Sequence, residues 1–340
     1  MLFALGALLN VILFIKVPSL LRNFSKRDLF LFFLSIEAIS TTGLALAVGA
    51  LWSAIFAVLF FATLPVLYLL LDFFLEEISL NHKTGEIRGI YLTCINAAIA
   101  VGPLIVAKFA DKNLQSIYLL ALVLLVPVFL SFLFFPKPIR KHTKHHDALH
   151  LPILNWLRRP DIRRVTTVRF VLQFFYALMV IFTPLYLHEV IQFSWSEIGL
   201  IFTIMLLPFV IFEWPMGELG DRYWGEKEIM TLGLFIMGIS LIIMPFLGKS
   251  FMAWATILFL SRVGASWVEV SAESYFFKKI SGDDVGLISI FKLATPVSII
   301  AGAFLGSVLL AFLPFNLIFF FLALVVLLGM KESLFIHDTL

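Results

Sequence analysis

The segment GELGDRYWGEK, residues 217–227, is a short charged turn rich in glycine, and long apolar runs flank it at residues 198–214 and 229–247. Glycine adopts backbone conformations that a tight turn between two membrane helices needs and that other residues avoid. Joining two helices does not require the acid–base pair Asp221 and Arg222 at the edge of a bilayer. We therefore expect this turn to do more than connect its two neighbours.

The composition indicates a protein that lies in lipid. The 340-residue chain is 61% hydrophobic and 14% charged, and it contains 38 phenylalanines. Soluble domains carry about 25% charged residues, so the low charge content argues against a soluble fold. A single cysteine, Cys94, excludes a disulfide or a thiolate metal cluster within this sequence.

Eleven apolar runs approach the length of about 20 residues that a membrane-spanning helix needs. They cover residues 1–17, 29–49, 51–74, 90–107, 114–135, 165–187, 198–214, 229–247, 252–275, 285–310 and 315–330. Backbone groups in hydrocarbon must form hydrogen bonds internally, and the alternating segments of a β-barrel strand are absent from this sequence. We therefore predict an all-α integral membrane protein with 11 transmembrane helices.

The distribution of lysine and arginine predicts the orientation. Almost all the loop lysines and arginines fall on one side of the predicted helices, and the other side holds only Lys108, Lys112 and Lys249. Cytoplasmic loops carry the excess of positive charge in membrane proteins. The turn at 217–227 and the C-terminus are therefore predicted to be cytoplasmic, and we expect the protein in the plasma membrane.

An internal repeat divides the chain. The same interval of 197 residues separates Pro18 from Pro215, Gly89 from Gly286, and Asp72 from Glu269. The two prolines are predicted to end helices, the two glycines to open helices, and the two acids to lie late in the preceding helices. Parallel repeats of this kind mark one group of secondary transporters.

The repeat predicts two bundles of helices. We expect a five-helix bundle at 1–139, a basic, histidine-rich cytoplasmic linker at 140–162 and a six-helix bundle at 163–340. Residues 165–187 have their repeat equivalent before residue 1, so we expect the first helix of the first half to be absent from this sequence.

The linker is predicted to be a solvated connector that contacts anionic lipid, because its prolines discourage a continuous helix. The alternative is a metal site formed by its histidines, His142, His145, His146 and His150. A histidine-rich tract is only compositional evidence for a metal. We therefore predict neither a metal site nor a cofactor.

The turn resembles the signature loop of the major facilitator superfamily at five positions: Gly217, Asp221, Arg222, Gly225 and Lys227. The signature places one residue between its basic residue and its second glycine, whereas both Tyr223 and Trp224 lie there in this sequence. The repeat and the basic linker are also similar to that family. The resemblance covers essentially the whole chain, as the second to twelfth helices of a two-bundle fold.

The resemblance implies transport by alternating access, in which two bundles expose a central cavity first to one side of the membrane and then to the other. It implies that Asp221 faces the start of the helix that opens at 86–89, because a carboxylate favours the positive end of a helix. Arg222 is expected to reach Glu269 or Glu273, which would close a latch. The alternative is a turn that only sets the topology. The matching turn at 18–28 has no glycine, so a latch there is degenerate or lost.

Charged residues inside the predicted spans are the candidates for substrate or proton binding, because an intramembrane charge needs a partner or a water-filled cavity. Arg262, Glu269 and Glu273 recur on one face of one helix. The resemblance places that helix beside the cavity. Arg262 is then the best candidate to contact an anionic or polar substrate or to pair with Glu269, and Glu269 and Glu273 are candidates to carry a proton.

Each of these residues has a structural alternative, because intramembrane polar groups also hold helices together. A permanent Arg262–Glu269 pair is as plausible as a substrate site. Four other intramembrane charges, for which a structural role is favoured, are Glu37, Arg169, Glu213 and Lys292. Glu37 and Arg169 stay among the candidates.

The sequence predicts a secondary active transporter of a small solute, with the lipid bilayer and a coupling proton as further partners and no nucleic acid. An enzyme is not expected, because the histidines form no nucleophile or metal constellation with nearby residues. The sequence contains no Walker loop, which argues against an ATP-driven pump. The alternatives are an integral-membrane enzyme, a lipid scramblase, and a non-transporting relic on a transporter fold.

Overall fold

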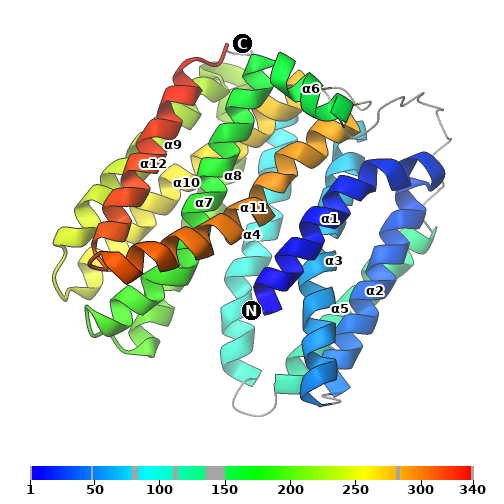
Figure 1. The fold of residues 1–340 in the computed structure, drawn as a ribbon, viewed down its shortest axis with the longest axis horizontal. Helices are drawn as coiled ribbons and strands as arrows, with labels where there is room; N and C mark the ends of the chain where they lie inside the picture. The colour runs from blue at the N-terminus through cyan, green and yellow to red at the C-terminus, as the bar shows by residue number, and fades with distance from the viewer. Residues whose placement is uncertain are drawn as a thin grey trace. The chain divides into compact units, whose positions relative to one another are not determined.

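The computed structural model describes residues 2–46, 49–78, 83–109, 114–134, 150–280 and 284–337, and all the regular structure in these residues is helical (Figure 1). This confirms the predicted fold class. The α-helices are α1 (Leu2–Asn23), α2 (Lys26–Leu46), α3 (Ala50–Ile78), α4 (Thr84–Phe109), α5 (Leu114–Phe134), α6 (His150–Arg158), α7 (Pro160–Glu189), α8 (Trp195–Leu219), α9 (Glu226–Ile243), α10 (Phe251–Lys279), α11 (Val285–Phe312) and α12 (Leu317–Leu334).

Each predicted apolar run overlaps one of the long helices. Within the described residues, 10 helices are long and apolar enough to cross a membrane. Helix α4 lies at the predicted run 90–107 but is not one of these, so the predicted count of 11 spans is not confirmed.

Two predicted helix ends are wrong. Pro18 lies inside α1 and Pro215 lies inside α8, and both helices continue past the proline by about one turn. A proline removes one backbone donor, but membrane helices tolerate this because neighbouring groups satisfy the freed carbonyl. The charged turns therefore begin later than the prolines indicated.

The linker contains a helix that the sequence did not predict. Helix α6 begins at His150 and holds Pro152 in its first turn, while Pro160 is the first residue of α7. Proline is tolerated at such positions because the first turn of a helix has no intrahelical use for the missing N–H. The rest of the histidine tract, including His142, His145 and His146, lies outside the described residues.

The chain forms two compact units that exchange helix segments. The first unit comprises Met1–Ile78, Gly102–Asn155 and Gly282–Val297, and the second comprises Ser79–Val101, Trp156–Ser281 and Ser298–Leu340. The start of α4 thus belongs to the second unit and the start of α11 to the first. These two segments occupy overlapping positions in the 197-residue repeat. The predicted bundle boundaries at residues 139 and 162 remain a prediction.

In the first unit, α3 packs against α1 and α2, and α2 packs against α5 (Figure 1). The contact between α2 and α5 contains the stacked rings of Phe30 and Phe132, whose centroids are 4.0 Å apart. Arg27 of α2 donates to the backbone carbonyl of Phe132 at 2.9 Å. Aromatic stacking and a satisfied helix end therefore hold this pair of helices together.

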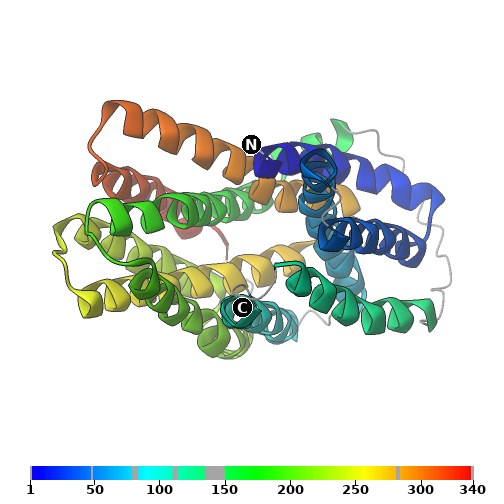
Figure 2. The ribbon, with the colours of Figure 1, turned by 90° about the horizontal axis from the view of Figure 1, so that it is seen from below.

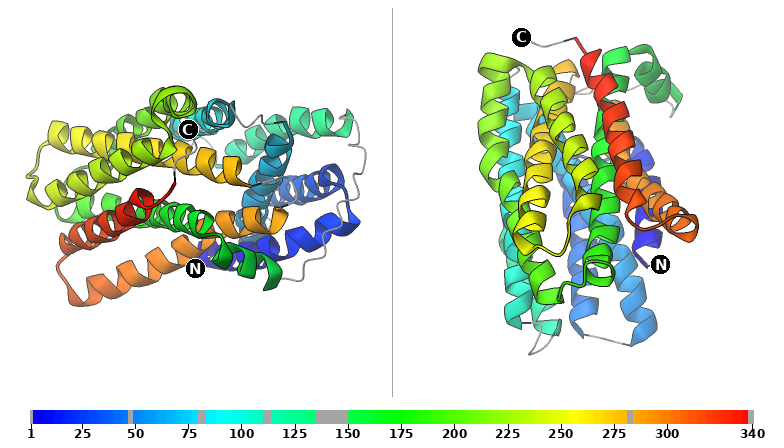
Figure 3. Two further views of the ribbon diagram at one scale, coloured as in Figure 1. Left: turned by 90° about the horizontal axis from the view of Figure 1, so that it is seen from above. Right: turned by 90° about the vertical axis from the view of Figure 1, so that its left-hand side faces the viewer.

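In the second unit, α10 packs against α8, α9 and α7, and α12 packs against α9 and α7 (Figures 2 and 3). The contact between α9 and α10 depends on glycine, because a Cβ atom on Gly233 would lie 2.6 Å from the carbonyl oxygen of Gly264. Small residues allow membrane helices to approach this closely. Helices α7 and α10 are the most deeply buried spans, so their polar side chains face protein rather than lipid.

Candidate functional site

The charged turn starts as a π-helical segment. Helix α8 continues into this segment, η2 (Gly220–Trp224), and Gly225 then breaks the helix with φ 77° before α9 begins. A π-helical turn accommodates one residue more than an α-helical turn. This accounts for the extra residue between Arg222 and Gly225, and the left-handed backbone at Gly225 explains why glycine stands there.

Asp221 caps the start of α4. Its Oδ1 accepts a hydrogen bond from the backbone N–H of Gly85 at 3.0 Å, and its Oδ2 accepts one from Glu86 at 2.8 Å. The ammonium of Lys278 lies 2.9 Å from Oδ1, and only 3% of the Asp221 side chain is exposed. We call these contacts the Asp221 cap. Residues 85 and 86 lie in the first turn of the helix that the resemblance indicated for Asp221.

Arg222 does not reach the acids that the sequence predicted for it. Its guanidinium lies 3.0 Å from Glu218, one turn earlier, and more than half of its side chain is exposed. Two consecutive residues of a helical turn point in different directions, and Asp221 is the one that contacts α10, through Lys278, so Arg222 points away from that helix. Lys278, at the end of α10, takes the place beside Asp221 and also contacts Glu226.

Two other signature residues, Gly217 and Lys227, lie in or beside the contacts between helices. Gly217 faces Gly85, and a Cβ atom on Gly85 would lie 2.5 Å from the Gly217 carbonyl oxygen. A Cβ atom on Gly89 would lie 2.7 Å from the carbonyl oxygen of Glu213. The backbones of α4 and α8 are therefore in direct contact along this face. Lys227 lies half-buried in the first turn of α9.

A second polar contact joins the same two helices deeper in the unit. The amide of Asn96 in α4 donates to Oε1 of Glu213 in α8 at 2.8 Å. Glu213 is completely buried, its Oε2 has no hydrogen-bond partner in the described residues, and it makes no ion pair there. A carboxyl group in this state is far cheaper to bury neutral than ionised.

Glu269 and Glu273 belong to a buried network with two arginines. Arg169 of α7 lies 3.2 Å from Glu269 and 3.4 Å from Glu273, and Arg88 of α4 lies 3.5 Å from Glu273. The hydroxyl of Tyr176 donates to Glu269 at 2.8 Å. Opposite charges compensate one another here, which lowers the cost of burying them.

Arg262 does not pair with Glu269, so that predicted contact is wrong. Its guanidinium carbon lies 4.7 Å from the ring centre of Phe175 and 5.8 Å from that of Tyr176, both on α7. Only 2% of Arg262 is exposed, and its Nη1 has no hydrogen-bond partner among the described residues. Arg262 therefore contacts aromatic ring faces rather than a carboxylate of the described residues.

Two of the intramembrane charges lie in the first unit. Glu37 of α2 is buried and accepts a hydrogen bond from the hydroxyl of Thr63 in α3. Lys292 of α11 lies 2.9 Å from Asp72 of α3. Sequence reasoning used Asp72 only to define the repeat and counted Arg88 and Lys278 as loop charges, so it missed the contacts of these three charged residues. Their nearness to the helix ends concealed that they are buried.

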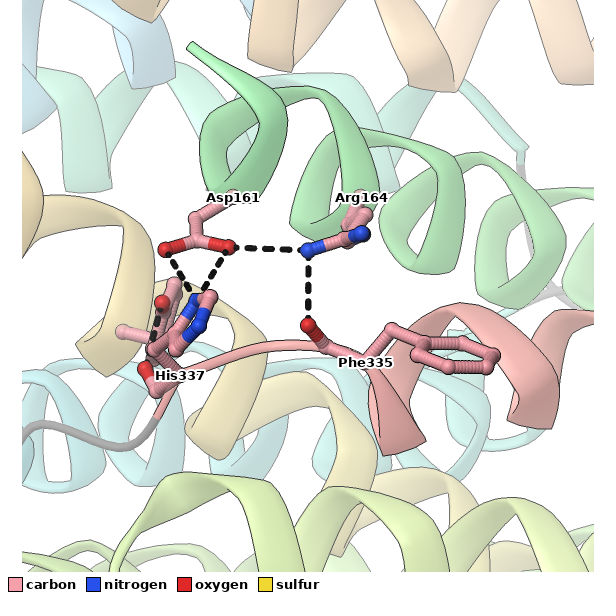
Figure 4. Close-up of polar contacts among 5 residues, drawn as sticks. Asp161, Arg164, Phe335 and His337 are labelled. Carbon is pink, nitrogen blue, oxygen red and sulfur yellow. Dashed lines mark hydrogen bonds and ion pairs between the residues drawn. The ribbon is translucent and has the colours of Figure 1, made fainter.

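The C-terminal segment is fastened to α7 (Figure 4). Arg164 lies 3.2 Å from Asp161 and donates to the backbone carbonyl of Phe335 at 2.6 Å, while the ring of His337 lies 3.3 Å from Asp161. The hydroxyl of Tyr275 in α10 donates to the carbonyl of His337 at 2.7 Å. These contacts tie the ends of three helices together. Within the described residues, the structure contains no cluster of His, Cys, Asp and Glu suited to a metal ion.

A family model described as the Major Facilitator Superfamily matches residues 165–336, about half of the chain. A comparison with curated proteins found no match.

Solved structures show the same fold. The human organic anion transporter MFSD10 (TETRAN) superposes with a TM-score of 0.80 at 16% identity, over 97% of this chain and 83% of that one. A bacterial homologue of the iron transporter ferroportin, in an outward-facing state, gives 0.76 at 15% identity, over 98% and 88%. The E. coli fucose:proton symporter FucP gives 0.77 at 16% identity, over 99% and 97%.

Proposed function

Because this chain belongs to the major facilitator superfamily of membrane transporters, we propose that it moves a small solute across the membrane by alternating access. The chain is an integral membrane protein, and its family and structural neighbours are transporters rather than enzymes. We propose the alternating-access mechanism and the coupling of transport to protons.

The observation that carries the proposal is the Asp221 cap. It joins the turn after α8 to the first backbone N–H groups of α4, which precedes that turn by more than 100 residues in the chain. A carboxylate at a helix start is stabilising, yet it depends on a few contacts that can break and re-form. We propose that the cap is intact in one state of the transport cycle and broken in the other. The contact between glycines of α4 and α8 supports this, because it requires no side chain to move aside.

The positively charged loops support a cytoplasmic position for this turn and for the C-terminus. We propose that the cap closes the cytoplasmic side of a transporter in the plasma membrane. Only the distribution of lysine and arginine supports this orientation.

The buried charges are the proposed sites of substrate and proton. Arg262 is proposed to contact the substrate, since it has no acidic partner among the described residues. Glu269 and Glu273 are less suited to carry a proton than the sequence indicated, because each of them forms an ion pair with Arg169. We propose that proton coupling uses a carboxyl group that has no cation partner in the described part of the chain, Glu213 or Glu37.

The structural neighbours carry different substrates. Their names give an organic anion, iron, and fucose with a proton. These substrates differ in charge and size, so the shared fold does not choose among them.

The proposal is tested by reconstituting the purified protein into liposomes and measuring the uptake of a panel of labelled solutes with and without a proton gradient. We expect saturable uptake of one solute class that Asp221→Asn slows. Lipid exchange between leaflets in the absence of solute flux would instead identify a scramblase. If Glu269→Gln abolished the proton dependence and Glu213→Gln and Glu37→Gln left it unchanged, our proton assignment would be wrong.

A further inference from the structure

Arg262 is a buried cation that no acidic side chain of the described residues neutralises. It lies in the middle of α10, 2% exposed, and its Nη1 has no hydrogen-bond partner in the described part of the chain. The structure gives it no carboxylate within ion-pair distance among the same residues, and only the rings of Phe175 and Tyr176 lie over its guanidinium. A buried cation is costly without a neutralising anion, and none of the described residues supplies one to Arg262.

Two other buried arginines of this unit, Arg169 and Arg88, are paired with glutamates. Arg169 contacts both Glu269 and Glu273, and Arg88 contacts Glu273. Tyr176, which could have linked Glu269 to Arg262, directs its hydroxyl at Glu269 and presents its ring to Arg262. Arg262 is thus separated from the acid that lies two turns further along its own helix.

Glu213, a further buried acid of the second unit, does not pair with Arg262 either. Glu213 accepts a hydrogen bond from Asn96 and makes no ion pair in the described residues. It is completely buried, a position that favours the neutral carboxyl group. Arg88 and Arg169 pair with Glu269 and Glu273, and among the described residues Arg262 is the cation of this group that has no acidic partner.

We propose that Arg262 binds the carboxylate of a small organic monoanion whose body is apolar or aromatic. A guanidinium presents paired N–H donors that match the two oxygens of a carboxylate. One uncompensated positive charge is neutralised by one negative charge, so a dianion would bring an unpaired charge into the unit. The rings of Phe175 and Tyr176, with Phe209 against Tyr176 at 6.0 Å, provide an apolar surface next to the charge.

This inference rests on the proposed function, since it names the class of solute that a transporter of this fold would carry. Binding can nevertheless be measured without transport. A binding experiment therefore tests the anion site, and a flux experiment tests the transport function.

The experiment measures the thermal unfolding temperature of the purified protein in detergent micelles as a function of probe concentration. The monocarboxylate probes are acetate, octanoate and benzoate. The controls are benzamide, which has the shape of benzoate without its charge, and phthalate, a dianion. We expect octanoate or benzoate to raise the unfolding temperature in a saturable way, with no effect of benzamide and an affinity for phthalate at least tenfold weaker.

Two variants test the residue. Arg262→Met should fold at least as well as the parent protein, because it removes an unpaired buried charge, and should lose at least tenfold in affinity for the monocarboxylate. Arg262→Lys keeps the charge without the paired donors and should lose several-fold. Arg222→Met, an exposed arginine, is the matched control and should bind as the parent does.

The proposal is overturned if no monocarboxylate stabilises the parent protein, if benzamide stabilises it as well as benzoate, or if both Arg262 variants bind as tightly as the Arg222 control. An Arg262→Met protein that does not fold would assign Arg262 a structural role unless Arg262→Lys folds with weakened binding. Monocarboxylate binding without solute flux in liposomes would reject the transport function and leave the anion site standing. Flux of a neutral solute without anion binding would do the reverse.

Discussion

Replacing Asp221 with Asn tests whether the Asp221 cap controls the position of α4. The substitution keeps the shape of the side chain and one acceptor oxygen but removes the charge that faces the first N–H groups of α4 and Lys278. Hydrogen bonds to a charged group contribute about 1.5–3 kcal/mol, against about 0.5–1.5 kcal/mol for neutral pairs. With two such bonds weakened, the capped state should lose about 2 kcal/mol relative to the uncapped state. That free energy corresponds to a change of about 30-fold in the ratio of the two populations.

The assay is a distance measurement between spin labels in lipid nanodiscs. Replacing the only cysteine, Cys94, with Ser gives a background in which Lys83→Cys labels the start of α4 and Leu334→Cys labels the end of α12. Both positions are exposed, and both belong to the second unit. We expect the parent protein to show mainly one distance, and Asp221→Asn to populate a second distance at its expense.

The matched control lies in the same turn. Arg222 and Glu218 form an exposed ion pair one turn apart, and such pairs contribute about 0.3–0.5 kcal/mol. Arg222→Gln should therefore change the population ratio by no more than about twofold. If Asp221→Asn and Arg222→Gln gave the same distance distribution as the parent, the cap would be a static helix cap and the reasoning would be refuted.

Three further outcomes are expected. Gly217→Ala should destabilise the contact between α4 and α8 by about 1–3 kcal/mol in chemical unfolding, because the new methyl group would meet the Gly85 carbonyl oxygen, whereas Gly199→Ala in the same helix meets open space and should be neutral. One of the variants Glu213→Gln and Glu37→Gln should abolish proton-driven accumulation of the solute in liposomes while solute exchange persists, because the amide mimics a carboxyl group that never releases its proton; accumulation at the parent level in both variants would contradict this. Asp161→Asn should speed amide hydrogen exchange at residues 335–337 by weakening the contacts of His337 and Arg164, with exchange in α9 unchanged as the internal reference.

The fold could be predicted from the sequence because each determinant is local or periodic. Apolar runs of sufficient length define helices in lipid whatever they pack against, and the 197-residue repeat orders them. The position of Asp221 was predicted from the resemblance to the major facilitator superfamily, in which the signature acid lies near a helix start of the opposite half, and the repeat indicated which helix start that is. A single proline near a helix end was a weaker guide, because Pro18 and Pro215 each remove only one hydrogen bond from a helix that lipid otherwise enforces.

The site itself was harder to predict because it depends on side-chain direction and on which helices meet. Spacing placed Arg262 and Glu269 on one face of α10, yet Glu269 turns to Arg169 and Tyr176 on α7, which no pattern within α10 reveals. Arg88 looked like a topogenic loop charge because it precedes an apolar run. It is completely buried against Glu273 and the ring of Phe277. Charges within one turn of a helix end can therefore serve either purpose, and only the packing decides.

The two halves of the repeat use the same architecture with different chemistry. In each unit an acid late in one helix meets a cation from the start of the helix that enters from the other half: Asp72 with Lys292 in the first unit and Glu273 with Arg88 in the second.

The turns, however, differ. In the turn of the first half, Lys26 donates to the carbonyl of Phe73 at 3.2 Å, and Arg27 donates to that of Phe132 at 2.9 Å, so its charges bind the ends of α3 and α5. In the turn of the second half, Asp221 binds the start of α4. A basic side chain suits the negative end of a helix and an acidic one suits the positive end. The contacts described for the first turn anchor its own bundle, whereas the second turn holds the start of α4, so the second turn is the one that we propose as a latch.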